Sequence, residues 1–418
     1  MRDILLLTVF LGLLPFCFLR PWIGVLVFSW ISYMNPHKYS WAVEYLPFAK
    51  IVALITIAGL LFTKDKMTLP KTRETILIVL LGLYFTFTCF FAFNQFSVWS
   101  QWEKVIKILI MTLVTMMLIN DRVKLRYLVM VIAFSIGLLG AKGGIFSLVT
   151  GGEFRVRGPN ESFFGENNDM ALALNMTLPM LAYLARDEVN KRLKLVLWVT
   201  FILCIISVIF TYSRGGFLTL IGVLLFLLLK SKYKSLSIMM ISAALIVGAL
   251  YIPAKWFERV ETIKTYEEDE SALGRINAWK TAINLAKDRP LIGGGFETFI
   301  DPVFNLYSPN PGNVRDVHSI YFEVLGEHGF VAFGLFISLI LFTLSTAQRL
   351  KGIARVSDNL KWVENYANMF QISLLAYMIG GIFLGRAYFD LFYHIVAMVV
   401  IMKVLVEKEI KEGNQVKI

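Results

Sequence analysis

Apolar stretches of about 20 residues recur along the whole chain, and each is long enough to cross a hydrocarbon core of about 30 Å as an α-helix. Of the 418 residues, 57% are hydrophobic and only 17% are charged, which is too apolar for an ordinary soluble domain. A transmembrane β-barrel would instead show alternating segments of about ten residues. The sequence therefore predicts an all-α polytopic integral membrane protein.

The connectors between the apolar stretches alternate in charge. Lysine and arginine gather in every second connector and in the C-terminal tail, which places these parts on the cytoplasmic side by the positive-inside rule. The net charge of +11 is thus spread over short loops and does not form a patch for nucleic acid. The predicted spans are 46–63, 74–93, 100–119, 124–149, 167–186, 195–211, 215–229, 235–252, 328–348, 368–385 and 387–403.

The first 34 residues decide the total number of spans. Arg20 and Pro21 stand where a signal peptide would have its cleavage site, so we expect a retained membrane segment. Alternation of the connectors places residues 35–45 outside. If Arg2 is inside, residues 1–34 cross an odd number of times and the chain has about 12 spans, and if the N-terminus is outside it has about 13.

One outer loop is far longer than the others and is net acidic. Its segment "SALGRINAWKTAINLAKDRP" has the apolar spacing of a helix, and a "GGGF" turn without a phosphate-loop lysine follows. The loop divides the chain into an N-terminal transmembrane bundle (1–252), the loop itself (253–327), and C-terminal membrane helices with a short tail (328–418).

Nothing in the sequence suggests a metal or another cofactor. The acidic run Glu267–Glu270 is consecutive, which is typical of a solvated face. The three cysteines lie far apart in apolar stretches, and no Cys/His cluster with zinc spacing is present. We expect neither a disulfide framework nor a bound metal.

Arginines at outer ends of spans run against the positive-inside rule and therefore suggest function. Arg214 is the clearest case, because "VIFTYSRGGFLTL" joins two spans through a tight outer turn, in which we expect Gly215 and Gly216 to bend the backbone. A guanidinium held there can bind phosphate oxygens in a bidentate way. The alternative is an arginine that snorkels and hydrogen-bonds the carbonyls of a helix end.

Two further outer sites have two interpretations each. Arg275 stands near the start of the loop helix, where the helix dipole disfavours a cation, so ligand binding competes with a surface salt bridge. Arg386 stands one helical turn before Asp390, and for it pairing with Asp390 competes with ligand contact, with pairing favoured. Lys142, near the outer end of its span, is expected to snorkel.

The segment "GGEFRVRGPNESFFGENNDMALAL" carries two arginines next to the predicted start of a span. Arg155 and Arg157 alternate and so face the same side. Asn168 and Asp169 are expected to cap the following helix, whose N-terminus would point outward and attract anions.

His318 lies in "VRDVHSIYFEVLGEHGF", at the outer end of an apolar segment and on the side where the arginines gather. A helix N-terminus and nearby cations would keep its imidazole neutral near pH 7, ready to accept a proton. The alternative is a capping or packing histidine. His328 is expected at the interface, and His37 and His394 have no supporting cluster.

Several of these segments resemble the bacterial O-antigen ligase and O-antigen polymerase superfamily. The opening "RPWIGVLVFSWISYMNPHKYSW" is similar to a branch of O-glycosylation ligases associated with exosortase systems. Nearly the whole chain is covered, because the superfamily's blocks follow in order: "GENNDMALAL", "TYSRGG", "LGRINAWKTA", "DRPLIGGGF" and "VHSIYFEVLGEHG".

The resemblance implies a GT-C-like membrane glycosyltransferase of about 12 helices with a long periplasmic loop. It implies transfer of a glycan from undecaprenyl diphosphate to a hydroxyl acceptor, without metal or nucleotide. In this chain Arg214 and Arg275 would hold the diphosphate and His318 would activate the acceptor. The superfamily's third arginine has four candidates here: Arg157, Arg289, Arg315 and Arg386.

The resemblance also implies a bacterial inner-membrane protein with its active site facing the periplasm and its C-terminus in the cytoplasm. The acceptor is a protein serine or threonine or a lipid A-core sugar for a ligase, and a growing glycan for a polymerase. A lipid-linked sugar flippase or transporter is the third alternative. Transporters usually show related halves or ionisable groups near the midplane, and neither is evident here.

Overall fold

The computed structural model of the chain describes residues 2–63, 68–160, 162–230, 270–355 and 358–415, with 238 and 242 as isolated positions. These described residues are helices and connecting segments and include no β-strand, as the composition predicts. The helices are α1 (Arg2–Leu19), α2 (Pro21–Met34), η1 (Pro36–Tyr39), α3 (Phe48–Phe62), α4 (Arg73–Cys89), α5 (Val98–Leu118), α6 (Arg122–Val149), α7 (Asn167–Asp187), α8 (Lys191–Ile209), α9 (Arg214–Leu229), α12 (Glu270–Asp288), α13 (Asp301–Tyr307), α14 (Ile320–Ala354), η2 (Asp358–Leu360), α15 (Lys361–Gly380) and α16 (Asp390–Gln415).

Four of the described helices are long and apolar enough to cross a membrane: α1, α6, α8 and α14. The apolar helices α2, α3 and α9 are shorter. This composition confirms a helical membrane protein.

Two predicted features lie outside the described residues. The predicted span 235–252 does, apart from its isolated positions 238 and 242, and so does the acidic run except Glu270, where α12 begins.

The first two helices form a hairpin. Helix α2 begins at Pro21, a residue suited to the first turn of a helix, directly after α1 ends. The hairpin returns the chain to its start, because the Ser40 hydroxyl and the Trp41 amide both donate hydrogen bonds to the Asp3 carboxylate. The start of α1 therefore lies close to Ser40 and Trp41. Whether residues 1–34 cross the membrane once or twice stays a prediction.

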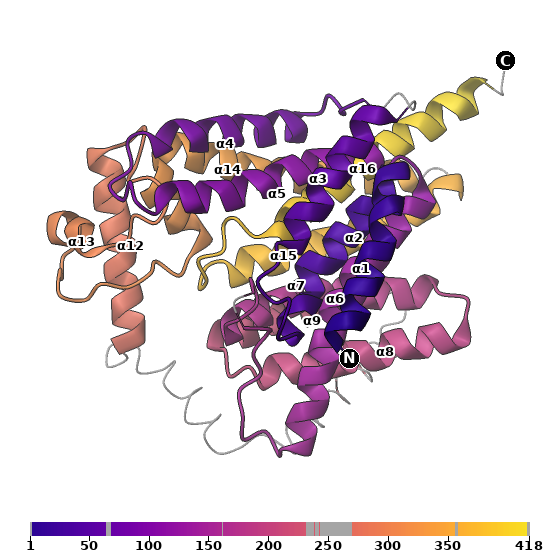
Figure 1. The fold of residues 1–418 in the computed structure, drawn as a ribbon, viewed down its shortest axis with the longest axis horizontal. Helices are drawn as coiled ribbons and strands as arrows, with labels where there is room; N and C mark the ends of the chain where they lie inside the picture. Colours follow the sequence, from indigo (N-terminus) through magenta and orange to yellow (C-terminus); the bar gives the residue numbers. More distant parts are fainter. Residues whose placement is uncertain are drawn as a thin grey trace.

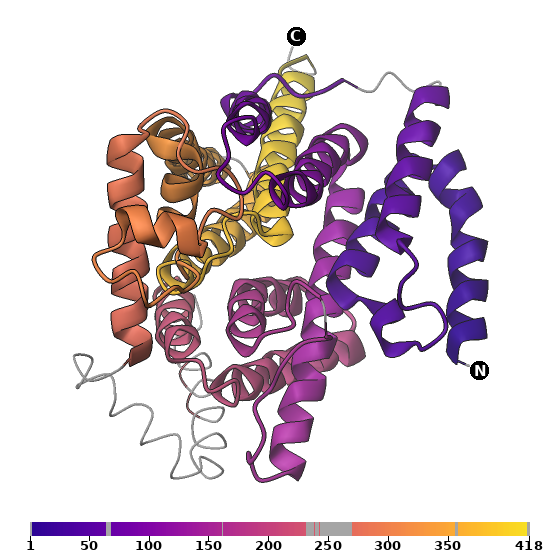
Figure 2. The same cartoon turned by 60° about the vertical axis from the view of Figure 1, so that its left-hand side comes forward.

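Helix α7 is the centre of the bundle. Every residue from Asp169 to Ala185 is buried, although its sequence is less apolar than that of its neighbours. It packs against α6, α8, α9 and α15. The two views place α12 and α13 at one edge of the molecule, beside the start of α14 (Figures 1 and 2). The body of α7 thus packs among four other helices, which fixes the position of its N-terminus.

Helix α14 is kinked at Gly329, where φ is +74°. A kink interrupts the helical ladder, so the carbonyls before it need donors from elsewhere. The "GGGF" segment supplies them: the Gly294 amide donates to Gly326 O at 2.9 Å, and the Gly295 amide to Glu327 O at 2.6 Å. The glycine segment thereby fixes residues 320–328 as a separate helical arm.

The tight turn before α9 is formed by a residue other than the two glycines that the sequence analysis expected. Tyr212 takes the left-handed conformation, with φ of +56°. Gly215 and Gly216 are helical, and a Cβ on either would clash with Phe383 or Ala171. The two glycines therefore permit close helix packing, and the prediction that they bend the backbone is wrong.

Close approach of α6 and α8 gives a test of the packing. A Cβ at Gly144 would overlap the backbone carbonyl of Leu203, which cannot move aside as a flexible side chain could. We expect Gly144→Ala to lower the free energy of unfolding by about 1 to 3 kcal/mol, measured as a fall in thermal midpoint in detergent. Gly334→Ala is the control, because a Cβ there meets nothing within 4 Å. Equal midpoints for the two variants would contradict this packing.

Candidate active site

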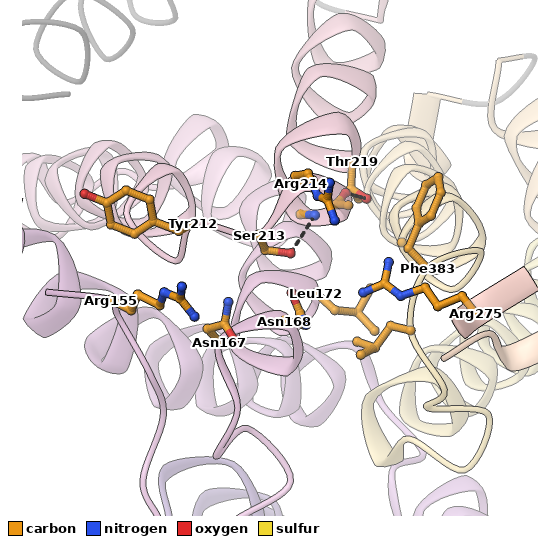
Figure 3. Close-up of a pocket in the computed structure, with 14 residues that line it drawn as sticks. Arg155, Asn167, Asn168, Leu172, Tyr212, Ser213, Arg214, Thr219, Arg275 and Phe383 are labelled. Atoms are coloured by element: carbon orange, nitrogen blue, oxygen red, sulfur yellow. Dashed lines mark hydrogen bonds between the residues drawn. The ribbon is translucent and has the colours of Figure 1, made fainter. Parts of the chain in front are cut away.

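A cavity of about 170 Å³ lies where the N-termini of α7 and α9 meet (Figure 3). Asn167 and Asn168 begin α7, and Arg214 begins α9 behind the cap Ser213. The Ser213 hydroxyl accepts a hydrogen bond from the Gly216 amide at 3.0 Å. The Asn167 side chain donates to Thr211 O at 2.8 Å and so joins the two helix starts.

Three arginines from separate segments line this cavity: Arg155, Arg214 and Arg275. In the close-up, Arg155 reaches in from one side and Arg275 from the other, with Arg214 between them (Figure 3). Arg155 is placed by its neighbour Val156, which is buried and whose amide donates to Phe210 O at 3.0 Å. The structure thus brings together the two arginines proposed for the diphosphate, and adds Arg155.

The cavity is suited to an anion of high charge. The start of a helix carries a partial positive charge and free amide donors, and two such starts converge here. Three guanidinium groups add full charges and the fork geometry that matches phosphate oxygens. Among the described residues that line the cavity, none is acidic.

Helix α12 carries Arg275 and is held against the segment before α14. The Trp279 indole donates to Val317 O at 2.8 Å, and the Asn277 amide donates to Asn310 O at 2.9 Å. Ala278 and Ala282 are fully buried in this contact. The predicted loop helix is therefore confirmed, and it fixes Arg275 relative to His318.

The four candidates for the third arginine do not line this cavity in the described structure. Arg157 lines a neighbouring cavity. Arg289 donates to Phe91 O at 2.6 Å and lies over the Phe93 ring. Arg315 donates to Asn313 Oδ1 at 3.1 Å. Arg386 is engaged by a carboxylate.

That carboxylate belongs to Asp169. Arg386 binds it through two nitrogens, with Nε 2.8 Å from Oδ1 and the second bond to Oδ2. Asp169 is 3% exposed. The expected pairing of Arg386 with Asp390 is therefore wrong. So is the expected capping role of Asn168 and Asp169, because the α7 N-cap position is Glu166. The pair ties the start of α7 to the segment between α15 and α16.

His318 lies directly before α14 and beside that same segment. Its neighbours hold it on both sides: Val317 O accepts from Trp279, and the Ile320 amide donates to Gly381 O at 2.8 Å. A Cβ at Gly385 would lie 3.5 Å from the His318 Cα. Leu384, one residue earlier, lines the arginine cavity. His318 thus lies next to a segment that lines the cavity but is not itself among the described lining residues, and its side chain remains partly open to solvent.

The backbone of His318 is in the left-handed region, with φ of +44°. A residue with a side chain takes this conformation rarely, and such strain is common at functional sites. Burial lowers the pKa of His318, as do Arg275 and Arg386, while Asp316 and Asp169 act to raise it. The Asp316 carboxylate lies 3.9 Å from Nδ1. The net lowering favours a neutral imidazole, which can accept a proton.

The other histidines are structural in their surroundings. His328 is fully buried in the protein, with Nδ1 2.6 Å from the Thr88 hydroxyl. His394 Nδ1 lies 2.7 Å from the Tyr33 hydroxyl. Both imidazoles pack among aromatic rings.

Two acids near His318 were missed from the sequence. Glu323 accepts a hydrogen bond from the Ala387 amide at 2.8 Å, and Glu327 accepts from the Tyr388 hydroxyl at 2.5 Å. Both lie on the first arm of α14, four residues apart and hence on one face. That spacing inside an otherwise apolar segment was the available signal. In the part of the chain that the structure describes, no group of three or more acidic, histidine or cysteine side chains is arranged to hold a metal.

Comparison with known families gives two matches. Residues 199–337 match the family described as O-antigen ligase. Residues 1–189 match a family of unknown function, DUF5935. Comparison with curated proteins gives no match.

The ion pair between Asp169 and Arg386 should contribute to stability. Asp169→Asn leaves the guanidinium without its counter-charge, and we expect a loss of about 2 to 3 kcal/mol in the free energy of unfolding. This is below the cost for a fully buried pair, because the Arg386 side chain is 37% exposed. Thermal unfolding in detergent measures it.

The control for this prediction is Glu103→Gln, which removes an exposed partner of Lys50 and Lys107. Exposed pairs are worth little, so its midpoint should stay close to that of the unaltered protein. If Asp169→Asn were as stable as the control, the pair would not hold α7 to the segment between α15 and α16.

Proposed function

We propose that this chain is a membrane glycan ligase, because residues 199–337 match the O-antigen ligase family. The coarse class, a membrane enzyme of the O-antigen ligase or polymerase type, follows from the match itself. The proposal adds the reaction: transfer of a glycan from undecaprenyl diphosphate to a hydroxyl acceptor, either a protein serine or threonine or a lipid A-core sugar. It also places the site on the periplasmic face of the inner membrane, with the C-terminus in the cytoplasm.

One observation supports this proposal above the others. Arg155, Arg214 and Arg275 line a cavity at two helix N-termini, and His318 lies against Gly385, the neighbour of the lining residue Leu384. A lipid-linked diphosphate has the charge for such a cavity. The proposed base is then near the sugar attached to that diphosphate, as attack on this sugar requires.

The proposed reaction is a single displacement. The His318 imidazole takes the proton of the acceptor hydroxyl as its oxygen attacks the anomeric carbon. The bond from that carbon to the diphosphate oxygen breaks, and its electron pair stays on the diphosphate. Arg155, Arg214 and Arg275 stabilise the charge that develops there. Attack from the face opposite the leaving group inverts the anomeric configuration.

The polymerase alternative has the same chemistry and differs only in the acceptor, which would be a second lipid-linked glycan. The family match fits both. A flippase is less well supported, because three of the unusual cations meet at helix ends around one small cavity. The proposal keeps three regions: the N-terminal transmembrane bundle 1–252, the periplasmic loop 253–327 with the proposed base, and the C-terminal membrane helices 328–418.

Substitution of His318 and Arg214 tests the proposal. We expect His318→Ala to lower kcat for glycan transfer by about 100-fold or more, because the base is lost while the donor still binds. Arg214→Ala should lower kcat/KM for the lipid donor by a similar factor, because the arginine binds the leaving group. The assay uses purified protein with lipid-linked glycan and compares a pilin-like protein, lipid A-core and the donor itself as acceptors.

Arg192→Ala is the control, because Arg192 is exposed at the start of α8 and does not line the cavity. All variants are compared at equal amounts of folded protein. Full transfer by His318→Ala would remove the general base from the proposal, and unchanged donor dependence in Arg214→Ala would remove the diphosphate site.

The lowered pKa of His318 predicts the acid side of the pH profile. Transfer is lost as the imidazole becomes protonated, so the midpoint should lie below pH 6.5, the usual pKa of histidine. Asp316 acts to raise this pKa, so Asp316→Asn should move the midpoint to still lower pH. Asp301→Asn, at an exposed acid of the same loop, should leave the profile in place. A shift of the midpoint upward in Asp316→Asn would refute the assignment.

A further inference from the structure

A second and larger cavity of about 430 Å³ adjoins the first one, and Arg155 lines both. It is formed by the segment after α2, the C-terminal part of α6 and the segment that leads to α7. All of its described lining residues fall within 1–189, the part that matches a family of unknown function. The catalytic proposal gives this cavity no role.

Four cations gather in this second cavity: Lys38, Lys142, Arg155 and Arg157. Lys142 Nζ lies 4.5 Å from the centre of the Tyr39 ring. Lys142 and both arginines are exposed, and among the described residues lining the cavity none is acidic. Like charges so close repel one another, and an anion between them relieves that repulsion. Arginine adds bidentate geometry for phosphate oxygens.

The wall of the second cavity is partly apolar and continues onto an exposed apolar surface. Phe146 lines the cavity, and its ring contacts that of Phe154. Nearby Ile145, Val149 and Phe154 are 52%, 79% and 56% exposed. All but Phe154 belong to α6, a helix apolar enough to cross a membrane. Cations beside such a surface are typical of a place where lipid head and tail regions meet.

We propose that the second cavity binds the phosphate headgroup of a membrane amphiphile, whose apolar chain lies along the C-terminal end of α6. Lys142 and Arg157 bind the headgroup, with Lys38 and Arg155 completing the charge. The amphiphile is either a bilayer phospholipid or a phosphorylated polyprenyl lipid, which share this chemistry. The inference concerns binding alone and does not depend on glycan transfer.

The test measures lipid binding to the purified full-length protein in neutral detergent by native mass spectrometry. The probes are phosphatidylglycerol, zwitterionic phosphatidylcholine, polyprenyl phosphate and inorganic phosphate. The variant carries Lys142→Gln and Arg157→Gln. We expect its affinity for the anionic lipids to fall by about tenfold or more, since each basic residue near a lipid surface contributes appreciably.

The matched control carries Lys280→Gln and Lys287→Gln, which remove two exposed charges from α12 and should leave binding unchanged. A charge-preserving variant with Lys142→Arg and Arg157→Lys should keep the affinity, which separates loss of charge from loss of fold. Equal binding of phosphatidylglycerol by the Gln variant and the unaltered protein would overturn the proposal.

The choice of probe distinguishes the sources. Tighter binding of polyprenyl phosphate than of phosphatidylglycerol supports a lipid-carrier headgroup, and the reverse order supports a bilayer phospholipid. Binding of phosphatidylcholine as tight as that of phosphatidylglycerol would overturn the role of the cations. If inorganic phosphate bound as tightly as both lipids, the apolar chain would contribute nothing to binding, and the proposal of an amphiphilic ligand would be overturned.

Discussion

The ion pair between the buried Asp169 carboxylate and the half-buried Arg386 is the constraint on which the geometry of the site depends. It joins the start of the central helix α7 to the segment between α15 and α16, and that segment passes between the arginine cavity and His318. A bidentate pair allows little sliding or rotation. The position of the proposed base relative to the cationic cavity therefore depends in part on a contact between residues 217 apart in sequence.

Much of the fold could be predicted from the sequence, because a membrane imposes length and charge rules on each segment separately. Helices α3 to α9 follow the predicted spans closely. The cost of placing an arginine at an apolar outer end likewise singled out Arg214, which lines the first cavity. The periodicity of the loop segment predicted the helix that carries Arg275. These are local properties, and a single sequence contains them.

Contacts between distant segments could not be predicted in the same way. Asp390 is near Arg386 in sequence, yet the guanidinium binds Asp169, which packing of α7 brings to it. Arg155 and Arg157 looked equivalent by spacing, but the anchoring of Val156 to Phe210 directs Arg155 into the first cavity. The sequence left one or two crossings open for residues 1–34, because the parity of charged loops fixes sides only when every crossing is known.

Arg155 lines two cationic cavities, and this has a thermodynamic consequence. One guanidinium can neutralise an anion fully in only one of them, so anions bound in both would weaken each other. Such coupling is reciprocal: each bound anion changes the affinity for the other anion by the same factor. For the two ligands proposed here, occupancy of one cavity would therefore lower the affinity of the other cavity for its anion.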